Sequence, residues 1–242
     1  MTASDRVIIF DTDGTLVDGR RAVLDAVAQA LIATYEHFEL AAPDPDRERI
    51  ALAMGLPSPV FFRTAFDPET VPGELQDVFV GEFEVQSTRA EVAALRRGES
   101  HLYPGAEATL ETLRERGYAL ALYSNAAEPY FQTVVEVHGL DRWFSRALSL
   151  EYAVRRRLAR NKPGMVRYLA RDYSSVVIVG DRIHDIDAGR ALGASTVGCR
   201  YGFGEEDELA RADWQIDDLA ELLDLACARP SAMSDDSSEA RG

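Results

Sequence analysis

Acidic side chains gather in two short stretches, each directly after an apolar run. "DTDGT" places Asp11 and Asp13 two residues apart, and "GDRIHD" places Asp181 and Asp185 four residues apart. Carboxylates that share one crevice raise each other's pKa unless a cation offsets their charge. Mg²⁺ binds through one or two carboxylates and keeps several waters, so this set favours a magnesium site. Either stretch taken alone is also compatible with a turn or a helix cap.

The EF-hand, another loop that opens with closely spaced carboxylates, does not fit this sequence. A calcium loop starting at Asp11 needs glycine at its sixth position and glutamate at its twelfth. Leu16 and Ala22 occupy those positions. Calcium binding of that kind is therefore excluded.

Two more stretches carry groups suited to an anion. "YSNA" ends an apolar run with Ser124 and Asn125, and a hydroxyl beside the N–H groups of a following helix can hold an anion. Lys162, in "NKPG", is the only lysine in a chain with 26 Lys and Arg residues. A compact ammonium suits a phosphoryl oxygen with a carboxylate beside it. Alternatively, "YSNA" is an ordinary turn, and Lys162 is the only lysine by chance.

These stretches follow the ends of predicted strands. Apolar runs at 6–10, 118–124 and 174–181, with a weaker one at 195–199, indicate buried parallel strands. Helical patterns alternate with them, at 105–117, 128–139, 164–172 and 185–193. The alternation predicts an α/β fold with a doubly wound, Rossmann-like parallel sheet. Such sheets bind ligands at the carboxyl edge of their strands, so we expect the polar stretches to converge there.

The alternation breaks between Asp18 and Arg97. Apolar residues share one helical face at the start of this segment: Val23, Leu24, Val27, Leu31, Tyr35 and Phe38. Proline and glycine then punctuate the chain up to a long helical pattern at 74–97. We predict a core domain of residues 1–17 and 98–229, an inserted helical cap of 18–97, and a disordered tail of 230–242.

Composition limits the function further. The chain has 242 residues, 46% of them hydrophobic, and its apolar runs are too short to cross a bilayer. A secretory signal pattern is lacking at the N-terminus, so we predict a cytoplasmic protein without a membrane partner. The net charge of −15 argues against nucleic acid binding. Two cysteines are too few for a disulfide framework. Monomer and homodimer both remain open.

Taken in order, "DTDGTLVD", "YSNA", "NKPG" and "GDRIHD" resemble the four motifs of the haloacid dehalogenase-like (HAD) hydrolase superfamily. The helical insert matches the place where C1-capped members, such as the phosphoglycolate phosphatase-like subgroup, carry a lid. The resemblance implies that Asp11 is the nucleophile that forms an aspartyl-phosphate. It also implies that Asp13 is the general acid and base.

The same resemblance implies a set of binding residues. Thr15, Ser124, Asn125 and Lys162 would hold the phosphoryl group, with Asn125 acting through its backbone. Lys162 would also pair with Asp11 and so belong to the catalytic residues. A Mg²⁺ ion would be held by Asp11, Asp181, Asp185 and the backbone carbonyl of Asp13. The substrate would be a small phosphorylated metabolite.

Three reaction types of the superfamily fit less well. Phosphonatases need a cap lysine, and residues 18–97 contain none. Dehalogenases lack the second aspartate, which is present here as Asp13, and sugar-phosphate mutases carry a histidine where this chain has Val23. We therefore expect a Mg²⁺-dependent phosphomonoester hydrolase. The alternatives are a phosphotransferase or mutase of the same fold, and a non-catalytic binding module.

Two features depart from the family pattern, and others are candidates for substrate selection or turns. Arg182 stands where relatives often have a small hydroxyl residue, and the segment 155–160 is unusually basic. The candidate substrate selectors are Arg20, Arg21, Arg63 and the loop 54–62. "YGFG", at 201–204, is interpreted as a turn after the fourth strand.

Overall fold

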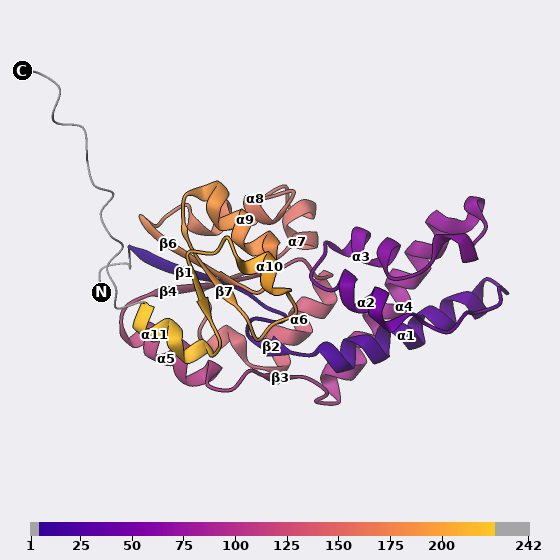
Figure 1. Cartoon of the computed structure of the whole chain (residues 1–242), viewed down its shortest axis with the longest axis horizontal. Coiled ribbons are helices and arrows are strands. Elements are labelled where there is room, and N and C mark those ends of the chain that lie inside the picture. The colour runs from indigo at the N-terminus through magenta and orange to yellow at the C-terminus, as the bar shows by residue number, and fades with distance from the viewer. Residues whose placement is uncertain (1–4, 226–242) are drawn as a thin grey trace, which may run out of the picture.

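The computed structural model describes residues 5–225. It consists of a sheet covered by helices and a group of helices that extends to one side of it (Figure 1). The predicted tail, residues 230–242, lies outside the described residues. Within 5–225, no helix is long and apolar enough to span a membrane.

The main sheet has six parallel strands, which confirms the predicted doubly wound α/β class. In spatial order they are β5 (Arg146–Ser149), β4 (Ala119–Ser124), β1 (Arg6–Asp11), β6 (Ser175–Gly180), β7 (Ser195–Cys199) and β8 (Trp214–Ile216). The register sets Asp11 opposite Tyr123. The two edge strands were not predicted, because β5 and β8 are too short for a clear apolar run.

Helices cover both faces of the sheet. Ile8 and Phe10 belong to one apolar cluster and Val7 and Ile9 to the other, as side-chain alternation along β1 requires. The first face carries α5 (Ala106–Glu115), α6 (Glu128–Val137) and α11 (Leu222–Leu225), with the short 3₁₀ turns η3 (Leu140–Arg142) and η4 (Leu219–Glu221). The second carries α7 (Leu150–Arg155), α8 (Lys162–Ala170) and α9 (Ile183–Leu192). Burial on both faces explains why the predicted strands are almost wholly apolar.

Residues 20–96 form the group of helices beside the sheet, here called the helical module (Figure 1). It contains α1 (Arg20–His37), α2 (Arg47–Ala53), α3 (Ser58–Thr64) and α4 (Gln76–Arg96), with 3₁₀ turns η1 (Pro68–Thr70) and η2 (Gly73–Leu75). The chain leaves and re-enters the sheet part through a short antiparallel pair, β2 (Val17–Asp18) and β3 (His101–Leu102). The predicted division into core and cap domains stays a prediction.

An aromatic cluster fills the centre of the helical module. Phe79 of α4 is fully buried, and its ring centroid lies 4.8 Å from that of Tyr35, 5.5 Å from Phe38 and 5.1 Å from Phe66. Large aromatic residues dominate the burial energy of small cores. Of the apolar face predicted for the first long helix, Val27, Leu31 and Tyr35 are buried, whereas Leu24 and Phe38 are partly buried and Phe38 follows the end of α1.

We expect Phe79→Ala to lower the free energy of unfolding by about 3–5 kcal/mol, because it leaves a cavity that the surrounding rings cannot fill. Urea denaturation followed by circular dichroism measures the change. Val78→Ala is the control: Val78 is 56% exposed, so its truncation should cost less than about 0.5 kcal/mol. Equal effects of the two changes would contradict a module stabilised by this cluster.

Candidate active site

Three of the predicted carboxylates meet at the carboxyl edge of the sheet. Asp11 ends β1, while Asp181 and Asp185 follow β6, the latter on the first turn of α9. One oxygen from each lies within 4.8 Å of the others, and all three side chains are buried. A Cβ atom at Gly180 would lie 2.2 Å from Cγ of Asp185, so the close approach of these segments requires glycine there.

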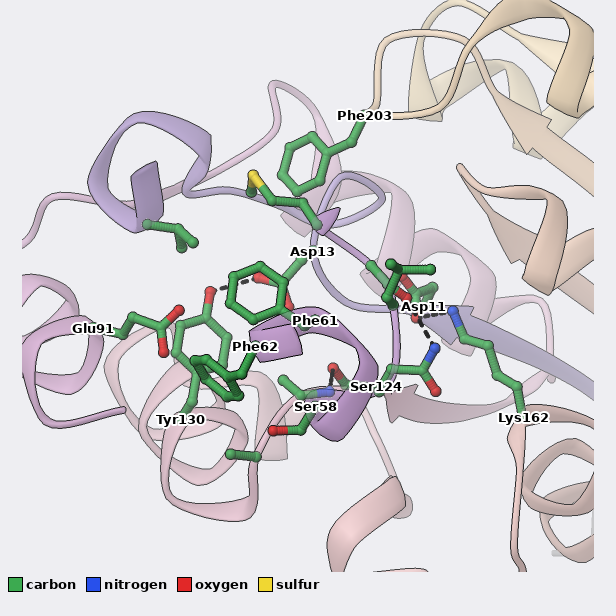
Figure 2. A pocket seen from close by; sticks show the side chains of 17 residues that line it. Asp11, Asp13, Ser58, Phe61, Phe62, Glu91, Ser124, Tyr130, Lys162 and Phe203 are labelled. Atoms are coloured by element: carbon green, nitrogen blue, oxygen red, sulfur yellow. Dashed lines mark hydrogen bonds and ion pairs between the residues drawn. The ribbon is translucent and has the colours of Figure 1, made fainter. Parts of the chain in front are cut away.

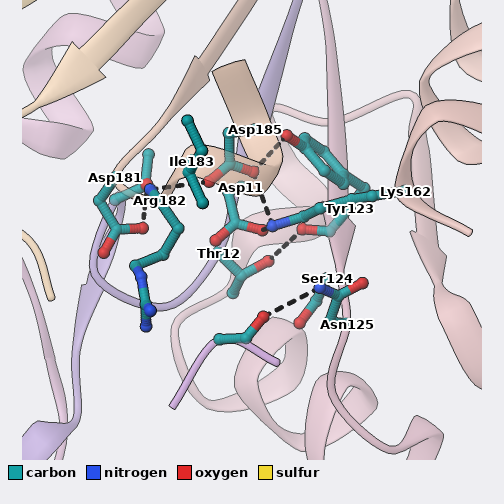
Figure 3. Close-up of polar contacts among 12 residues, drawn as sticks. Asp11, Thr12, Tyr123, Ser124, Asn125, Lys162, Asp181, Arg182, Ile183 and Asp185 are labelled. Atoms are coloured by element: carbon teal, nitrogen blue, oxygen red, sulfur yellow. Dashed lines mark hydrogen bonds and ion pairs between the residues drawn. The ribbon is translucent and has the colours of Figure 1, made fainter. Parts of the chain in front are cut away.

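Lys162 lies between two of these carboxylates. Its Nζ is 2.9 Å from Oδ1 of Asp11 and 2.6 Å from Oδ1 of Asp185 (Figure 3). The lysine begins α8, whose first turn is capped by Asn161: its Oδ1 accepts from the Gly164 N–H at 2.9 Å. Burial lowers the pKa of Lys162, but the attraction of the two carboxylates outweighs it and raises the pKa above its ordinary value. The ammonium is therefore charged at neutral pH.

The three carboxylates carry more negative charge than this lysine offsets. Burial raises the pKa of Asp11 well above its ordinary value despite Lys162, and burial with the charge of Asp185 raises the pKa of Asp181 to about 7. With all three ionised, three carboxylates and one ammonium would leave two negative charges, 3 − 1 = 2. A divalent cation would balance them, and all-oxygen donors suit Mg²⁺. The residues present thus fit the predicted cofactor.

Asp13 does not join this cluster through its side chain. The Tyr130 hydroxyl donates a hydrogen bond to its Oδ1 at 2.7 Å, and the carboxyl group lines the pocket described below. Burial raises the pKa of Asp13 to about 6, although Tyr130 and Lys162 oppose the increase. A carboxyl group with that pKa exchanges a proton near neutral pH. The proposed metal contact through its backbone carbonyl stays a prediction.

The other predicted phosphoryl-binding residues surround Asp11. Ser124, at the end of β4, lines the same pocket, and its Oγ accepts from the Ala126 N–H at 3.1 Å. The Thr15 hydroxyl donates to Oδ1 of Asp181 at 3.2 Å. Asn125 also lines the pocket, but its amide donates to the carbonyl of Gly55 in the helical module at 2.9 Å. Its buried Oδ1 has no partner within 5–225.

Tyr123 was missed by the sequence analysis. Its hydroxyl donates to Oδ1 of Asp185 at 2.6 Å, and its ring centroid lies 5.0 Å from Nζ of Lys162. The backbone N–H of Arg182 donates to the other oxygen of Asp185 at 3.0 Å. A tyrosine inside an apolar strand gives no signal of such a role. Both oxygens of Asp185 are thus fixed before any ligand binds.

The "YGFG" turn has a second role that its sequence did not indicate. The Phe203 N–H donates to Oδ2 of Asp181 at 2.7 Å. A Cβ atom at Gly202 would lie 2.3 Å from the Cβ of Asp181, and one at Gly204 would lie 1.9 Å from its carbonyl oxygen. The turn therefore packs directly on the Asp181 backbone, which only glycine allows.

The sheet part and the helical module meet over these residues. Arg182, noted above as unusual for the family, donates to the carbonyl of Met54 and pairs with Glu208 at 2.9 Å. Together with the bond from Asn125 to Gly55, this contact holds the start of the predicted loop 54–62 over the carboxylates. The basic segment 155–160 is elsewhere, and its four arginines are exposed.

A pocket lies between the two parts of the molecule (Figure 2). Asp11, Asp13 and Lys162 line its inner end, and residues from 54–62 line its outer end. Only the first part of 54–62 is the predicted loop, because residues 58–62 belong to helix α3. The predicted selectors Arg20, Arg21 and Arg63 do not line it. Arg63 instead pairs with Asp77 at 2.7 Å on the exposed surface of the module.

Glu91 of α4 is a further lining residue that the sequence analysis missed. It is partly buried, and Figure 2 shows its carboxyl group on the same side of the pocket as Tyr130. Burial, with a smaller contribution from the charge of Asp13, raises the pKa of Glu91 to about 8. An acid on a long helix of mixed composition gives no sequence signal for this position.

If the carboxylates hold the predicted Mg²⁺, we expect Gly204→Ala to weaken its binding by about tenfold or more, because the added methyl group would displace Asp181. Isothermal titration calorimetry measures the affinity. Gly73→Ala is the control, since a Cβ atom there meets nothing within 4 Å. If both variants bind the ion as the unaltered protein does, the turn does not position Asp181.

We expect the stability of the protein to fall as pH rises toward 8, in part because of Glu91. The folded state holds its proton up to about pH 8, whereas the unfolded state releases it near 4.5. Rising pH therefore favours unfolding, by at most about 1.4 kcal/mol per pH unit within this window. In Glu91→Gln this contribution is absent, so the variant should gain stability relative to the unaltered protein between pH 5 and 8.

Urea denaturation at several pH values measures this difference. Glu36→Gln, at an exposed position of α1, controls for the loss of one negative charge. A stability difference between Glu91→Gln and the unaltered protein that does not vary with pH would refute the raised pKa.

Comparisons with known proteins agree with this geometry. Residues 6–193 match the haloacid dehalogenase-like hydrolase family. The chain is 30% identical to a phosphoglycolate phosphatase of Haemophilus influenzae, covering 93% of this chain and 100% of the relative. It is 27% identical to a phosphoglycolate phosphatase of Pasteurella multocida, with 91% and 97% covered.

A solved structure gives the same result. The crystal structure of a predicted phosphoglycolate phosphatase from Haemophilus somnus superposes with a TM-score of 0.76 at 25% identity, covering 93% of this chain and 100% of that one. These similarities in sequence and structure confirm the predicted superfamily and its phosphoglycolate phosphatase-like subgroup. They also confirm the prediction that the protein is a phosphatase. The chain belongs to the haloacid dehalogenase-like hydrolases.

Proposed function

We propose that this protein is a Mg²⁺-dependent phosphomonoester hydrolase that acts on a small phosphorylated metabolite through an aspartyl-phosphate. One observation carries the proposal: the only lysine of the chain bridges Asp11 and Asp185 at distances of 2.9 and 2.6 Å. This contact joins the third motif to the first and the fourth at one sheet edge. The names of the relatives support the same activity.

Asp11 is the proposed nucleophile. Its carboxylate would attack the phosphorus atom, expel the alcohol and form an acyl phosphate, which divides hydrolysis into two displacements. Lys162 holds Oδ1 of this carboxylate at 2.9 Å and so fixes its orientation. The ammonium also provides positive charge for the phosphoryl oxygens. Ser124 and the backbone after β4 would complete the phosphoryl-binding site.

Asp13 is the proposed general acid and base. Its pKa of about 6 leaves a protonated fraction that can be given to the departing alcohol. The ionised form can then take a proton from the water that attacks the acyl phosphate. The hydrogen bond from Tyr130 holds the carboxyl group at the pocket, away from the metal cluster.

Asp11, Asp181 and Asp185 would hold the cation, with the Asp13 carbonyl as a further ligand. When bound, Mg²⁺ would offset the charge of the carboxylates and of the phosphoryl oxygens. Tyr123 and the Arg182 N–H hold Asp185, and the Phe203 N–H holds Asp181. The protein thus orients two of its predicted metal ligands through hydrogen bonds of its own.

The helical module is the proposed cap. It contributes the outer wall of the pocket and contacts the sheet part through the carbonyls of Met54 and Gly55. A cap in this position excludes bulk water and contacts the alcohol part of the substrate. The intact set of Asp11, Asp13, Lys162 and Asp181 argues against a non-catalytic binding module.

We expect Asp11→Asn to abolish Mg²⁺-dependent release of phosphate from an aryl phosphate, because the nucleophile is lost. Lys162→Arg should lower kcat/KM on the order of 10³-fold or more, since the wider guanidinium cannot take the buried position of the compact ammonium, 2.9 and 2.6 Å from the two carboxylates. Arg167→Lys, an exposed exchange on the same helix, is the control and should keep full activity.

Phosphate release is measured colorimetrically with Mg²⁺ and with chelator, and trapped phosphoprotein is sought by mass spectrometry. An alcohol added as acceptor separates hydrolysis from phosphotransfer, because transfer would give a new phosphate ester in place of free phosphate. Activity that persists with chelator, or in Asp11→Asn, would contradict the proposed mechanism.

A further inference from the structure

The pocket wall beyond the catalytic carboxylates is mostly apolar. Its larger apolar side chains are those of Val23, Met54, Leu56, Phe61, Phe62 and Phe203. The Ser58 hydroxyl, which also lines the pocket, already donates to Oε1 of Glu84 at 2.9 Å. The alcohol part of a substrate would therefore contact carbon over most of its surface.

Charge in this pocket is unevenly distributed. Asp11, Asp13 and Glu91 are acidic, and Lys162 is the only cation among the lining residues of the described chain. That lysine is committed to Asp11 and Asp185. At the outer end of the pocket, a leaving group with a carboxylate would meet the acid Glu91 and no cation.

Two arginines border the pocket without lining it, and both have partners. The guanidinium of Arg20 lies over the Phe203 ring, 4.7 Å from its centroid, and donates to the carbonyl of Gly202. Arg182 binds Met54 and Glu208. Both guanidinium groups are thus engaged by protein groups outside the lining of the pocket.

Glu91 is the polar group at the outer end that has no partner. Within residues 5–225, no hydrogen bond or ion pair holds its carboxyl group. Its negative charge is therefore costly among the apolar side chains around it, as its pKa of about 8 reflects. Asp13, whose carboxyl group is held by Tyr130 at 2.7 Å, adds negative potential to the same space.

We infer that the pocket selects phosphomonoesters of apolar alcohols that carry a protonated amine, and that Glu91 is the specificity residue that pairs with it. The ammonium would give the unpartnered carboxylate a counter-ion inside an apolar wall, where such a pair is strong. The faces of Phe61 and Phe62 would also favour a cation. This inference rests on the proposed function and differs from it in excluding a carboxylate-bearing leaving group such as glycolate.

Three aryl phosphates of similar size test the inference: phenyl phosphate, its para-aminomethyl derivative and its para-carboxy derivative. We measure kcat/KM for each with the unaltered protein and with Glu91→Gln. For each ester, dividing the kcat/KM of Glu91→Gln by that of the unaltered protein cancels the intrinsic reactivity of the ester. Glu91→Gln should reduce the preference for the aminomethyl over the carboxy substrate by about tenfold or more.

Glu36→Gln, exposed on α1, is the control for overall charge and should leave the preference unchanged. A second pair, 2-aminoethyl phosphate against phosphoglycolate, repeats the comparison without the ring. A merely structural role of Glu91 would lower kcat/KM for all three aryl esters by the same factor.

The outcomes separate the two proposals. Turnover of phenyl phosphate with a preference for the amine that depends on Glu91 supports both. The inference is overturned if the carboxylate-bearing substrates are hydrolysed as well as or better than the amines, or if Glu91→Gln leaves the preference unchanged. The proposed phosphatase activity stands in both cases. Failure of folded, Mg²⁺-supplied protein to hydrolyse any of these esters overturns both.

Discussion

The site depends on one buried ion pair network, in which the ammonium of Lys162 joins Asp11 and Asp185. Buried charges of this kind are costly unless each has a partner, and removing one partner leaves the other uncompensated. Lys162 is also the first residue of α8, while Asp11 ends β1 and Asp185 lies in the first turn of α9. The same contact that arranges the predicted chemistry therefore fixes how a strand and two helices meet.

Negative charge left over from this network explains the surrounding hydrogen bonds. The Tyr123 hydroxyl, the Arg182 N–H and the Phe203 N–H all donate to carboxylates that carry more charge than Lys162 offsets. Each donor comes from a different segment, so the acid cluster orders strand β4, the turn after β6 and the "YGFG" turn together. Preorganised donors of this kind lower the cost of holding the ligands in one geometry before a cation arrives.

The sequence predicted the parts of the structure that rest on local, repeated patterns. Four parallel strands were found because burial on both faces makes them continuous apolar runs, and the acids after β1 and β6 were found because strand ends converge at one edge. Asn125 was predicted to hold phosphate through its backbone, which stays a prediction, while its amide was found to contact the helical module. Tyr123, Glu91 and Arg182 were not assigned a role, because their contacts join segments whose spacing in the chain carries no pattern.

Substrate choice is the property that depends most on such long-range contacts. Glu91 lies eighty residues from Asp11 in the chain, 91 − 11 = 80, yet both line one pocket. Its importance comes from what surrounds it: an apolar wall, a neighbouring acid and, among the described lining residues, no cation other than Lys162, which is paired with Asp11 and Asp185. Two members of a family can share every motif and still differ in such a wall. The charge inside the pocket therefore predicts the alcohol part of the substrate better than the similarity of the motifs does.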